Sequence, residues 1–196
     1  MRQSSIAPIA IVGLGLMGEV YAQRLIAAGH RVIGFDIDPA RRARLADIGG
    51  QPVASIAGLA KPARAILVAV FSTAQVEDVI ENHLLPALGE GSNKIVVVMS
   101  TCDPDQVARL AARVTPRGIR YLDVPVSGTS DQVRRGDGVA LIGGEPAIAA
   151  ELKDVFDALF ARSFQVGKIG DGGRAKLAVN LILGLNRLAL AEGLVF

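Results

Sequence analysis

Short β-branched runs alternate with longer helical patterns along most of the chain, and this alternation restricts the fold more than any other feature. The first runs are IAIV, RVIGFD and AILVAV, and helical patterns such as EVYAQRLIAAG and PARRARLADIG occur between them. Such alternation is typical of βαβ units, whose right-handed crossovers make neighbouring strands parallel. The sequence therefore predicts an α/β domain with a doubly wound, mainly parallel sheet.

The same alternation continues to about residue 170. KIVVVMS at residues 94 to 100 and IRYLDV at 119 to 124 indicate two further strands, and GVALIGG at 138 to 144 and FQVG at 164 to 167 indicate two more. TAQVEDVIENHLLPAL reads as helical, and a helix is expected around residues 146 to 161. We expect residues 1–170 to form one domain, which residues 171–196 leave as the start of a long helix.

Composition and charge narrow the class of protein. Hydrophobic residues make up 51% of the 196 residues and aromatic residues only 4%, which is typical of buried parallel strands covered by helices. A net charge of +2, from 21 basic and 19 acidic residues, gives no reason to expect nucleic acid as a partner. The single cysteine, Cys102, cannot form an internal disulfide, which agrees with a cytoplasmic location. The short apolar run near the N-terminus leads into a glycine pattern, so we do not interpret it as an export signal.

A glycine pattern follows the first predicted strand and opens the first predicted helix. In a dinucleotide-binding turn, the first glycine allows the tight turn, the second lets the backbone approach a pyrophosphate, and the third lets the helix pack on the strand. The N–H groups at the start of the helix then face the phosphates. We assign the whole turn to cofactor binding: Gly13, Leu14, Gly15, Leu16, Met17 and Gly18. The domain is thus predicted to be of the Rossmann type.

Asp36 ends the second predicted strand, near the distance from the glycines at which such folds place an acidic residue. A carboxylate there can accept hydrogen bonds from both ribose hydroxyls of NAD, and it would repel the additional phosphate of NADP. The alternative is that Asp36 only begins a turn. Arg41 and Arg42 leave NADP open, because a nearby arginine could hold a 2′-phosphate, but NAD is favoured.

Ser127, Gly128 and Thr129 form a small hydroxyl-rich turn just beyond the strand that ends near Asp123. Ligands of open parallel sheets lie beyond the carboxyl ends of the strands, so this turn could offer N–H and O–H groups to a substrate carboxylate. An ordinary Ser-Gly-Thr turn with no ligand is the alternative.

Lys176 and Asn180 lie four residues apart near the start of the terminal helix, and therefore on one face of it. The positive end of the helix dipole makes the lysine proton easier to lose, which suits general acid/base catalysis. The alternative is a solvated lysine with an asparagine acting near the helix cap.

Three segments, GLGLMG, DVPVSGT and GDGGRAKLAVN, resemble in this order the motifs of the β-hydroxyacid dehydrogenase family, which includes 3-hydroxyisobutyrate dehydrogenase and tartronate semialdehyde reductase. The resemblance covers essentially the whole chain. It implies that the glycine turn holds NAD(P), that Ser127 and Gly128 bind a small hydroxy acid, and that Asn180 orients this substrate. Lys176 would then be the catalytic residue. The same resemblance places the walls of the cofactor site at Phe71, Ser72 and Thr101.

Thr129 departs from the family pattern, which has a second glycine there, so it is expected to narrow the pocket or add a hydroxyl contact. Imine reductases share the fold but usually lack the lysine. The 6-phosphogluconate dehydrogenases have a histidine where this chain has Val179. Both are alternatives, as is a dinucleotide-binding module without catalysis.

The same resemblance also implies what the terminal helix leads to. Family members normally continue through a long helix, which corresponds to residues 173–196, into an all-helical second domain. We therefore expect a missing domain, weak or absent turnover of the chain as given, and a homo-oligomer when the protein is full length. Arg187 and Glu192 would be costly in lipid, so a membrane span is not expected.

Overall fold

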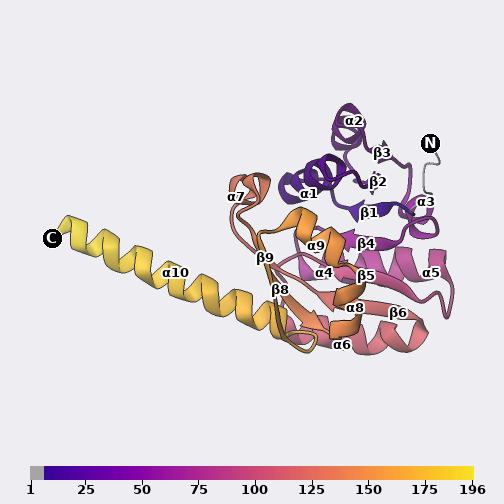
Figure 1. Cartoon of the computed structure of the whole chain (residues 1–196). Helices are drawn as coiled ribbons and strands as arrows, with labels where there is room; N and C mark the ends of the chain where they lie inside the picture. Colours follow the sequence, from indigo (N-terminus) through magenta and orange to yellow (C-terminus); the bar gives the residue numbers. More distant parts are fainter. Residues whose placement is uncertain (1–6) are drawn as a thin grey trace.

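The computed structural model describes residues 7–196, which form a nine-stranded sheet with helices on both faces (Figure 1). Six strands are parallel and run in the order β3-β2-β1-β4-β5-β6. Their bounds are Ile9–Val12 (β1), Val32–Phe35 (β2), Gln51–Pro52 (β3), Ala65–Val68 (β4), Lys94–Val98 (β5) and Ile119–Asp123 (β6). The order places β1 inside the sheet, with β2 on one side and β4 on the other. The predicted doubly wound, mainly parallel sheet is confirmed.

Successive residues of β1 explain why helices cover both faces. Ile9 and Ile11 belong to one core, with Tyr21 of α1 (Leu16–Ala27). Ala10 and Val12 belong to the other core, on the opposite face. The remaining helices are α2 (Pro39–Asp47), α3 (Ile56–Ala60), α4 (Thr73–Asp78), α5 (Leu85–Leu88), α6 (Pro104–Val114), α7 (Ser130–Arg135), α8 (Pro146–Glu151), α9 (Lys153–Leu159) and α10 (Asp171–Val195). Because side chains alternate between two buried faces, the strand reads as continuously apolar.

The sheet changes direction beyond β6. The strand β8 (Val139–Gly144) pairs antiparallel with β6 and with the short β7 (Val126–Ser127), and β9 (Arg162–Gly167) pairs parallel with β8. The sequence predicts Ser127 as part of a turn, whereas the structure places it at the end of β7. The alternation of strands and helices does not reveal this reversal, because it depends on how residues 124 to 138 turn back on β6.

Helix boundaries are where the sequence-based expectations differ from the structure. The helix expected around residues 146 to 161 is in fact two, because Leu152 has φ −109° and ψ 18° between α8 and α9. The helical stretch after residue 72 contains a π-helical segment, Val79–Leu84, between α4 and α5. The strand β3 and the helix α3 were not expected at all. Both are short, and local periodicity is weak over so few residues.

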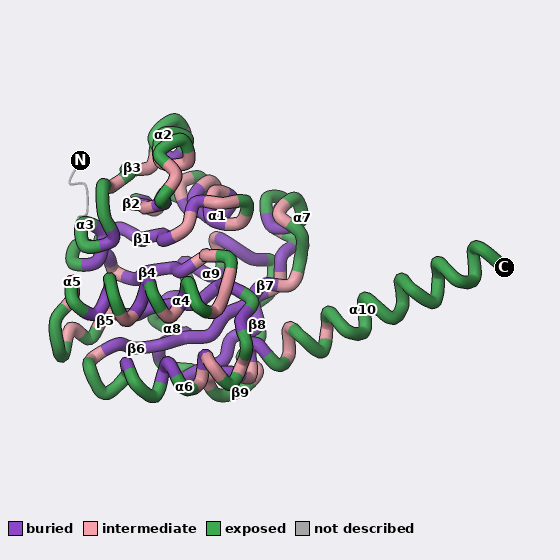
Figure 2. The backbone as a smooth tube through the Cα atoms, turned by 180° about the vertical axis from the view of Figure 1, so that it is seen from behind, coloured by how far each residue is buried: buried purple, intermediate pink, exposed green. Residues whose placement is uncertain are grey.

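The helix α10 extends away from the domain and is exposed along most of its length (Figures 1 and 2). Its fully buried residues are Gly172 and Gly173 in the first turn. Seven large apolar residues of this helix are more than half exposed: Leu181, Ile182, Leu185, Leu188, Leu190, Leu194 and Val195. Within residues 7–196, α10 is also the one helix long and apolar enough to cross a membrane. Length and composition alone do not decide this, and the expectation of no membrane partner stays a prediction.

Candidate functional site

The glycine turn joins β1 to α1 and has little room for side chains at two of its three glycines. Gly13 has φ +92°, and a Cβ there would lie 2.5 Å from the carbonyl oxygen of Ala69. A Cβ at Gly18 would collide with the carbonyl oxygen of Gly13. At Gly15 the nearest group would be the guanidinium of Arg41, with Nη1 at 3.4 Å. Gly13 and Gly18 are therefore required by packing, whereas a Cβ at Gly15 would make ordinary contact with the Arg41 side chain alone.

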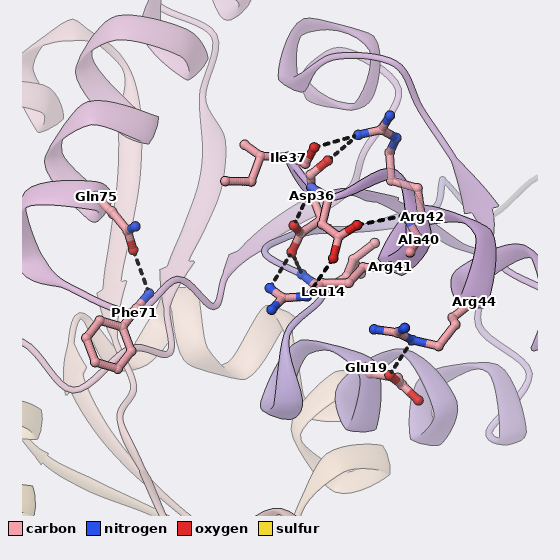
Figure 3. Close-up of polar contacts among 11 residues, drawn as sticks. Leu14, Glu19, Asp36, Ile37, Ala40, Arg41, Arg42, Arg44, Phe71 and Gln75 are labelled. Carbon is pink, nitrogen blue, oxygen red and sulfur yellow. Dashed lines mark hydrogen bonds and ion pairs between the residues drawn. The ribbon is translucent and has the colours of Figure 1, made fainter.

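Asp36 follows β2 and ties its end to the glycine turn (Figure 3). Its carboxylate, only 5% exposed, accepts hydrogen bonds from the N–H of Leu14 (2.7 Å to Oδ2) and from the N–H of Asp38 (2.9 Å to Oδ1). Arg41 Nη1 lies 3.4 Å from Oδ2. A carboxylate with two oxygens has lone pairs left after these contacts, so it can still accept from a ligand hydroxyl.

The two arginines after Asp36 point in different directions. Arg41 lies beside Gly15 and Asp36, and its side chain is 42% exposed. Arg42 donates to the backbone carbonyl of Asp36, and its guanidinium lies over the ring of Phe35, 5.8 Å from the centroid. Arg41 is therefore the cation that faces the glycine turn (Figure 3).

Phe71, Ser72 and Thr101 follow the carboxyl ends of β4 and β5. Phe71 is 94% exposed, and its backbone N–H donates to Gln75 Oε1 at 2.9 Å (Figure 3). Ser72 caps α4, since its Oγ accepts from the N–H of Gln75 at 3.2 Å. Thr101 is exposed, next to Ser100, which is buried. An apolar ring thus lies beyond the end of β4, which pairs with β1, and an exposed threonine lies beyond the end of β5, which pairs with β4.

Ser127, Gly128 and Thr129 connect β7 to α7. Gly128 has φ +136°, a conformation that favours glycine. Thr129 forms a capping box with Gln132: its Oγ1 accepts from the N–H of Gln132 at 3.3 Å, and its own N–H donates to Gln132 Oε1 at 2.8 Å. The hydroxyl of Thr129 therefore caps α7, while its proton and the hydroxyl of Ser127 remain able to donate to a ligand.

Lys176 and Asn180 lie on α10, which contacts β6, β7 and β8. Lys176 is partly buried and Asn180 is exposed. Burial lowers the pKa of the Lys176 ammonium from its ordinary value. Because α10 contacts the strand that ends at Ser127, the lysine helix and the hydroxyl-rich turn belong to one region of the molecule.

Asp123 is a buried polar residue of this region whose contribution the sequence did not reveal. It ends β6, is 1% exposed, and its Oδ2 accepts from the N–H groups of Gly170 (3.2 Å) and Gly173 (2.9 Å) at the start of α10. Burial raises the pKa of its carboxyl to about 6, against the opposing effect of these two hydrogen bonds. The available signal was that Asp123, like Asp36, is an acidic residue at a strand end near a glycine-rich turn.

Other features of the surface do not define a site of their own. A wide hollow at the ends of β8 and β9 is lined by Gly144, Pro146, Gln165 and Lys168, among others, and none of the predicted site residues lines it. Within residues 7–196, no group of three or more His, Cys, Asp and Glu side chains could hold a metal ion. The candidate site is therefore at the glycine turn and the carboxyl ends of the strands, and not at the hollow.

A doubly wound sheet whose first strand passes through a three-glycine turn into a helix, with a buried aspartate after β2, defines a dinucleotide-binding domain. A family model described as the NAD binding domain of 6-phosphogluconate dehydrogenase matches residues 8–167. The chain belongs to this family of NAD-binding domains and, within it, to the β-hydroxyacid dehydrogenases, as its three motifs predicted.

Relatives and solved structures agree with this assignment. The 2-hydroxy-3-oxopropionate reductase of Escherichia coli K12 is 34% identical over 190 residues, which cover 96% of this chain and 64% of the reductase. A crystal structure of 3-hydroxyisobutyrate dehydrogenase from Salmonella typhimurium is 29% identical, with a TM-score of 0.85 over 96% of this chain and 66% of that one. An imine reductase variant from Myxococcus stipitatus in complex with NAD+ has a TM-score of 0.88 over 96% of this chain and 65% of that one. At 19% identity, it shows a shared fold only.

Proposed function

We propose that the protein is an NAD(P)-dependent oxidoreductase that transfers a hydride between the nicotinamide and a small β-hydroxy acid, similar to 3-hydroxyisobutyrate, or its semialdehyde. One observation carries the proposal: the helix with Lys176 begins against the carboxyl end of β6, at the edge of the parallel sheet where β1 enters the glycine turn. Ligands of such sheets bind at this edge. A cofactor on the glycine turn and a substrate beside Lys176 would therefore be neighbours.

The residues at the glycine turn fit a dinucleotide. The N-terminus of α1 and the Arg41 guanidinium beside Gly15 suit a pyrophosphate, and Asp36 can accept from the ribose hydroxyls. We assign the walls of the cofactor site to Leu16, Phe71, Ser72 and Thr101; Leu16 and Phe71 are large apolar side chains that are mostly exposed in the domain. The bound nicotinamide supplies the hydride acceptor or donor. The chain's own residues supply position and proton transfer.

Lys176 is proposed to be the general acid/base. In the oxidation direction a neutral Lys176 takes the hydroxyl proton of the substrate, and in reduction its ammonium returns the proton to the carbonyl oxygen. The lowered pKa of Lys176, which follows from its partial burial, favours the neutral form that oxidation needs. Ser127, Gly128 and Thr129 would hold the substrate carboxylate, and Asn180 would orient the hydroxyl.

NAD is proposed as the preferred cofactor, with NADP as the alternative. Asp36 is buried and already tied to Leu14, so a 2′-phosphate at this position would meet a fixed negative charge. Arg41 is exposed enough to compensate in part. Titrating the protein with NAD+ and with NADP+ measures the preference directly, and tighter NADP+ binding would reverse this assignment.

Properties of the whole protein are also proposals, because the chain spans 64% of the length of the E. coli reductase. We propose that residues up to 170 form the cofactor domain and that α10 leads from it towards an all-helical domain. The exposed apolar residues of α10 would be covered there or by a second subunit in a homo-oligomer. A cytoplasmic location and the absence of membrane and nucleic-acid partners are proposed on the sequence grounds given above.

The test is a panel assay. The purified protein is mixed with NAD+ and 3-hydroxyisobutyrate, L-threonate or other small hydroxy acids, and NADH formation is followed by absorbance. Reduction of 2-hydroxy-3-oxopropionate with NADH tests the reverse direction. Turnover of at least one compound is expected of the full-length protein, whereas residues 1–196 alone are expected to turn over weakly or not at all. Tight NAD+ binding with no turnover of any of them by the full-length protein would instead favour a non-catalytic dinucleotide-binding module, and turnover of cyclic imines alone would favour an imine reductase.

A further inference from the structure

We propose that Asp123 is a positioning residue for Lys176: its carboxylate caps the first turn of α10 from the end of β6 and so fixes where Lys176 lies. The proposal rests on the proposed function of Lys176 and deepens it. Asp123 does not itself touch the reacting atoms in this proposal. It acts through the backbone of Gly170 and Gly173.

The first turn of α10 has no capping side chain of its own. Its N-cap residue is Gly170, with φ +93°, and a helix leaves its first four N–H groups without intrahelical partners. Asp123 Oδ2 accepts from two groups of this turn, the N–H of Gly170 and the N–H of Gly173. These donors are 47 and 50 residues away from Asp123 in sequence. A carboxylate at a helix N-terminus also interacts favourably with the helix dipole.

The glycines around Asp123 allow this contact because a side chain at either Gly172 or Gly143 would collide with the neighbouring backbone. A Cβ at Gly172 would lie 2.6 Å from the carbonyl oxygen of Asp123 and 2.9 Å from its Oδ2. From the other side, a Cβ at Gly143 of β8 would lie 2.8 Å from the N of Gly172. The helix therefore starts in direct backbone contact with the ends of β6 and β8. This close packing makes the start of α10 sensitive to small displacements.

The side chains of α10 add little to this backbone contact. Its buried residues are Gly172 and Gly173, and the ion pairs of Arg174 with Asp105 and with Asp171 are exposed. Exposed ion pairs contribute little to stability. Lys176 lies three residues beyond Gly173, less than one helical turn, so a shift of the capped turn moves the ammonium group with it.

The charge on Asp123 depends on pH in the range where such an enzyme would be assayed. Burial raises the pKa of its carboxyl to about 6, so it is ionised at pH 8 and largely protonated at pH 5. The charged groups that act on it are Asp171 and Arg174 of α10, and it acts in turn on the thiol of Cys102 and the phenol of Tyr121. The two glycine hydrogen bonds lower the pKa of this carboxyl while burial raises it, so a protonated carboxyl that stays buried is the weaker acceptor and the cap loosens as the pH falls through about 6.

The test uses Asp123→Asn, which removes the charge at nearly constant size, and Asp105→Asn as the matched control. Asp105 also contacts α10, through Arg174, but its side chain is 68% exposed. Turnover of NAD+ with 3-hydroxyisobutyrate is measured from pH 5 to 9, together with hydrogen-exchange protection of residues 170 to 173.

In D123N we expect turnover at pH 8 to fall by about tenfold to a hundredfold, as for a misplacement of about 1 Å, with NAD+ affinity unchanged. The acid limb near pH 6 should disappear from its profile, and amide protection should fall. D105N should match the wild type in both measurements. A D123N protein with wild-type protection, turnover and pH profile would overturn the proposal.

Two further outcomes are separable. If D123N does not fold, the wild-type protein alone tests the cap, because protection of residues 170 to 173 should decrease between pH 8 and pH 5 more than protection of α6; equal protection would overturn the proposal. If the full-length wild type turns over no hydroxy acid, the proposed function fails, while the exchange measurement still decides whether Asp123 holds the helix.

Discussion

Two glycine-rich turns lead from strands into helices at the same edge of the sheet, one before α1 and one before α10. In each, the helix begins after a glycine, Gly15 or Gly170, which has no side chain to cap it. In each, an aspartate at the end of another strand accepts hydrogen bonds from the turn. Asp36 accepts from the N–H of Leu14, and Asp123 accepts from Gly170 and Gly173.

The two turns differ in where the aspartate is placed. Asp36 bonds the turn ahead of the helix, so the N-terminus of α1 stays open beside Gly15. Asp123 bonds the first turn of α10 itself, and the protein's own carboxylate occupies the position that an anionic ligand would take. A glycine-rich turn before a helix therefore does not by itself indicate an anion site. The N–H groups can bind an anion only if no acceptor of the protein itself already receives their hydrogen bonds.

The largest expected effect concerns α10, whose first turn is capped by Asp123. Lys176→Ala should lower turnover by about a hundredfold or more, because a general acid/base contributes about 10²–10⁴ to rate, and it should leave NAD+ binding unchanged. Steady-state kinetics and NAD+ titration measure the two effects. Lys168→Ala, at an exposed lysine just before α10, is the control. Near-normal turnover of K176A would remove Lys176 from the mechanism.

A second prediction concerns the stability that the protein loses by burying the charged carboxylate of Asp123 at the start of α10. The pKa of Asp123 is raised from 3.8 to about 6, so the folded protein binds this proton more tightly than the unfolded chain. As the pH rises through this window the contribution of Asp123 to the free energy of unfolding falls, by about 3 kcal/mol in total.

Denaturant unfolding at pH 4.5 and pH 7.5 measures this contribution. The free energy of unfolding of D123N minus that of the wild type should be larger at pH 7.5 than at pH 4.5, because D123N lacks the charge whose burial costs stability. A stability difference between the two proteins that does not change with pH would contradict the raised pKa.

Packing at the open turn gives a third, smaller effect. Gly18→Ala brings a Cβ against the carbonyl oxygen of Gly13 and should lower the free energy of unfolding by about 1–3 kcal/mol and weaken NAD+ binding. Gly184→Ala is the control, because a Cβ there meets nothing within 4 Å. Denaturant midpoints of the two variants should separate clearly. Equal midpoints would mean that the contact between α1 and β1 relaxes without cost.

The smallest effect is expected for cofactor choice at the open turn. Arg41→Ala removes the cation beside Gly15 and Asp36 and should weaken NADP+ binding by roughly fivefold, corresponding to about 1 kcal/mol for a partly exposed charge. NAD+ binding should change less. Arg42→Ala, which removes the side chain over Phe35, should leave the ratio of the two affinities unchanged. Fluorescence titration with both cofactors tests this, and a larger effect of R42A would reverse the assignment.

Local pattern predicted the parts of the fold whose cause is local. Ile9 to Val12 is apolar at every position because both faces of β1 are buried, and that run is readable from sequence. The sequence does not reveal the helix break at Leu152, because helical periodicity continues across it. It does not reveal the antiparallel strand β8 either, because that pairing depends on how the chain packs after Asp123. That Thr129 narrows the pocket or adds a hydroxyl contact stays a prediction, and the structure adds that its hydroxyl caps α7 by accepting from the N–H of Gln132, three positions away.

The sequence by itself determined the class of domain, the glycine turn and its family, because these depend on neighbours within a few residues and on patterns that repeat along the chain. Only the tertiary structure decided that Arg41 rather than Arg42 faces the turn, and that Asp123 holds the start of the lysine helix. Both depend on groups brought together by strand pairing. The bond from Asp123 to Gly173 spans 50 residues, and no local pattern encodes a contact over that distance.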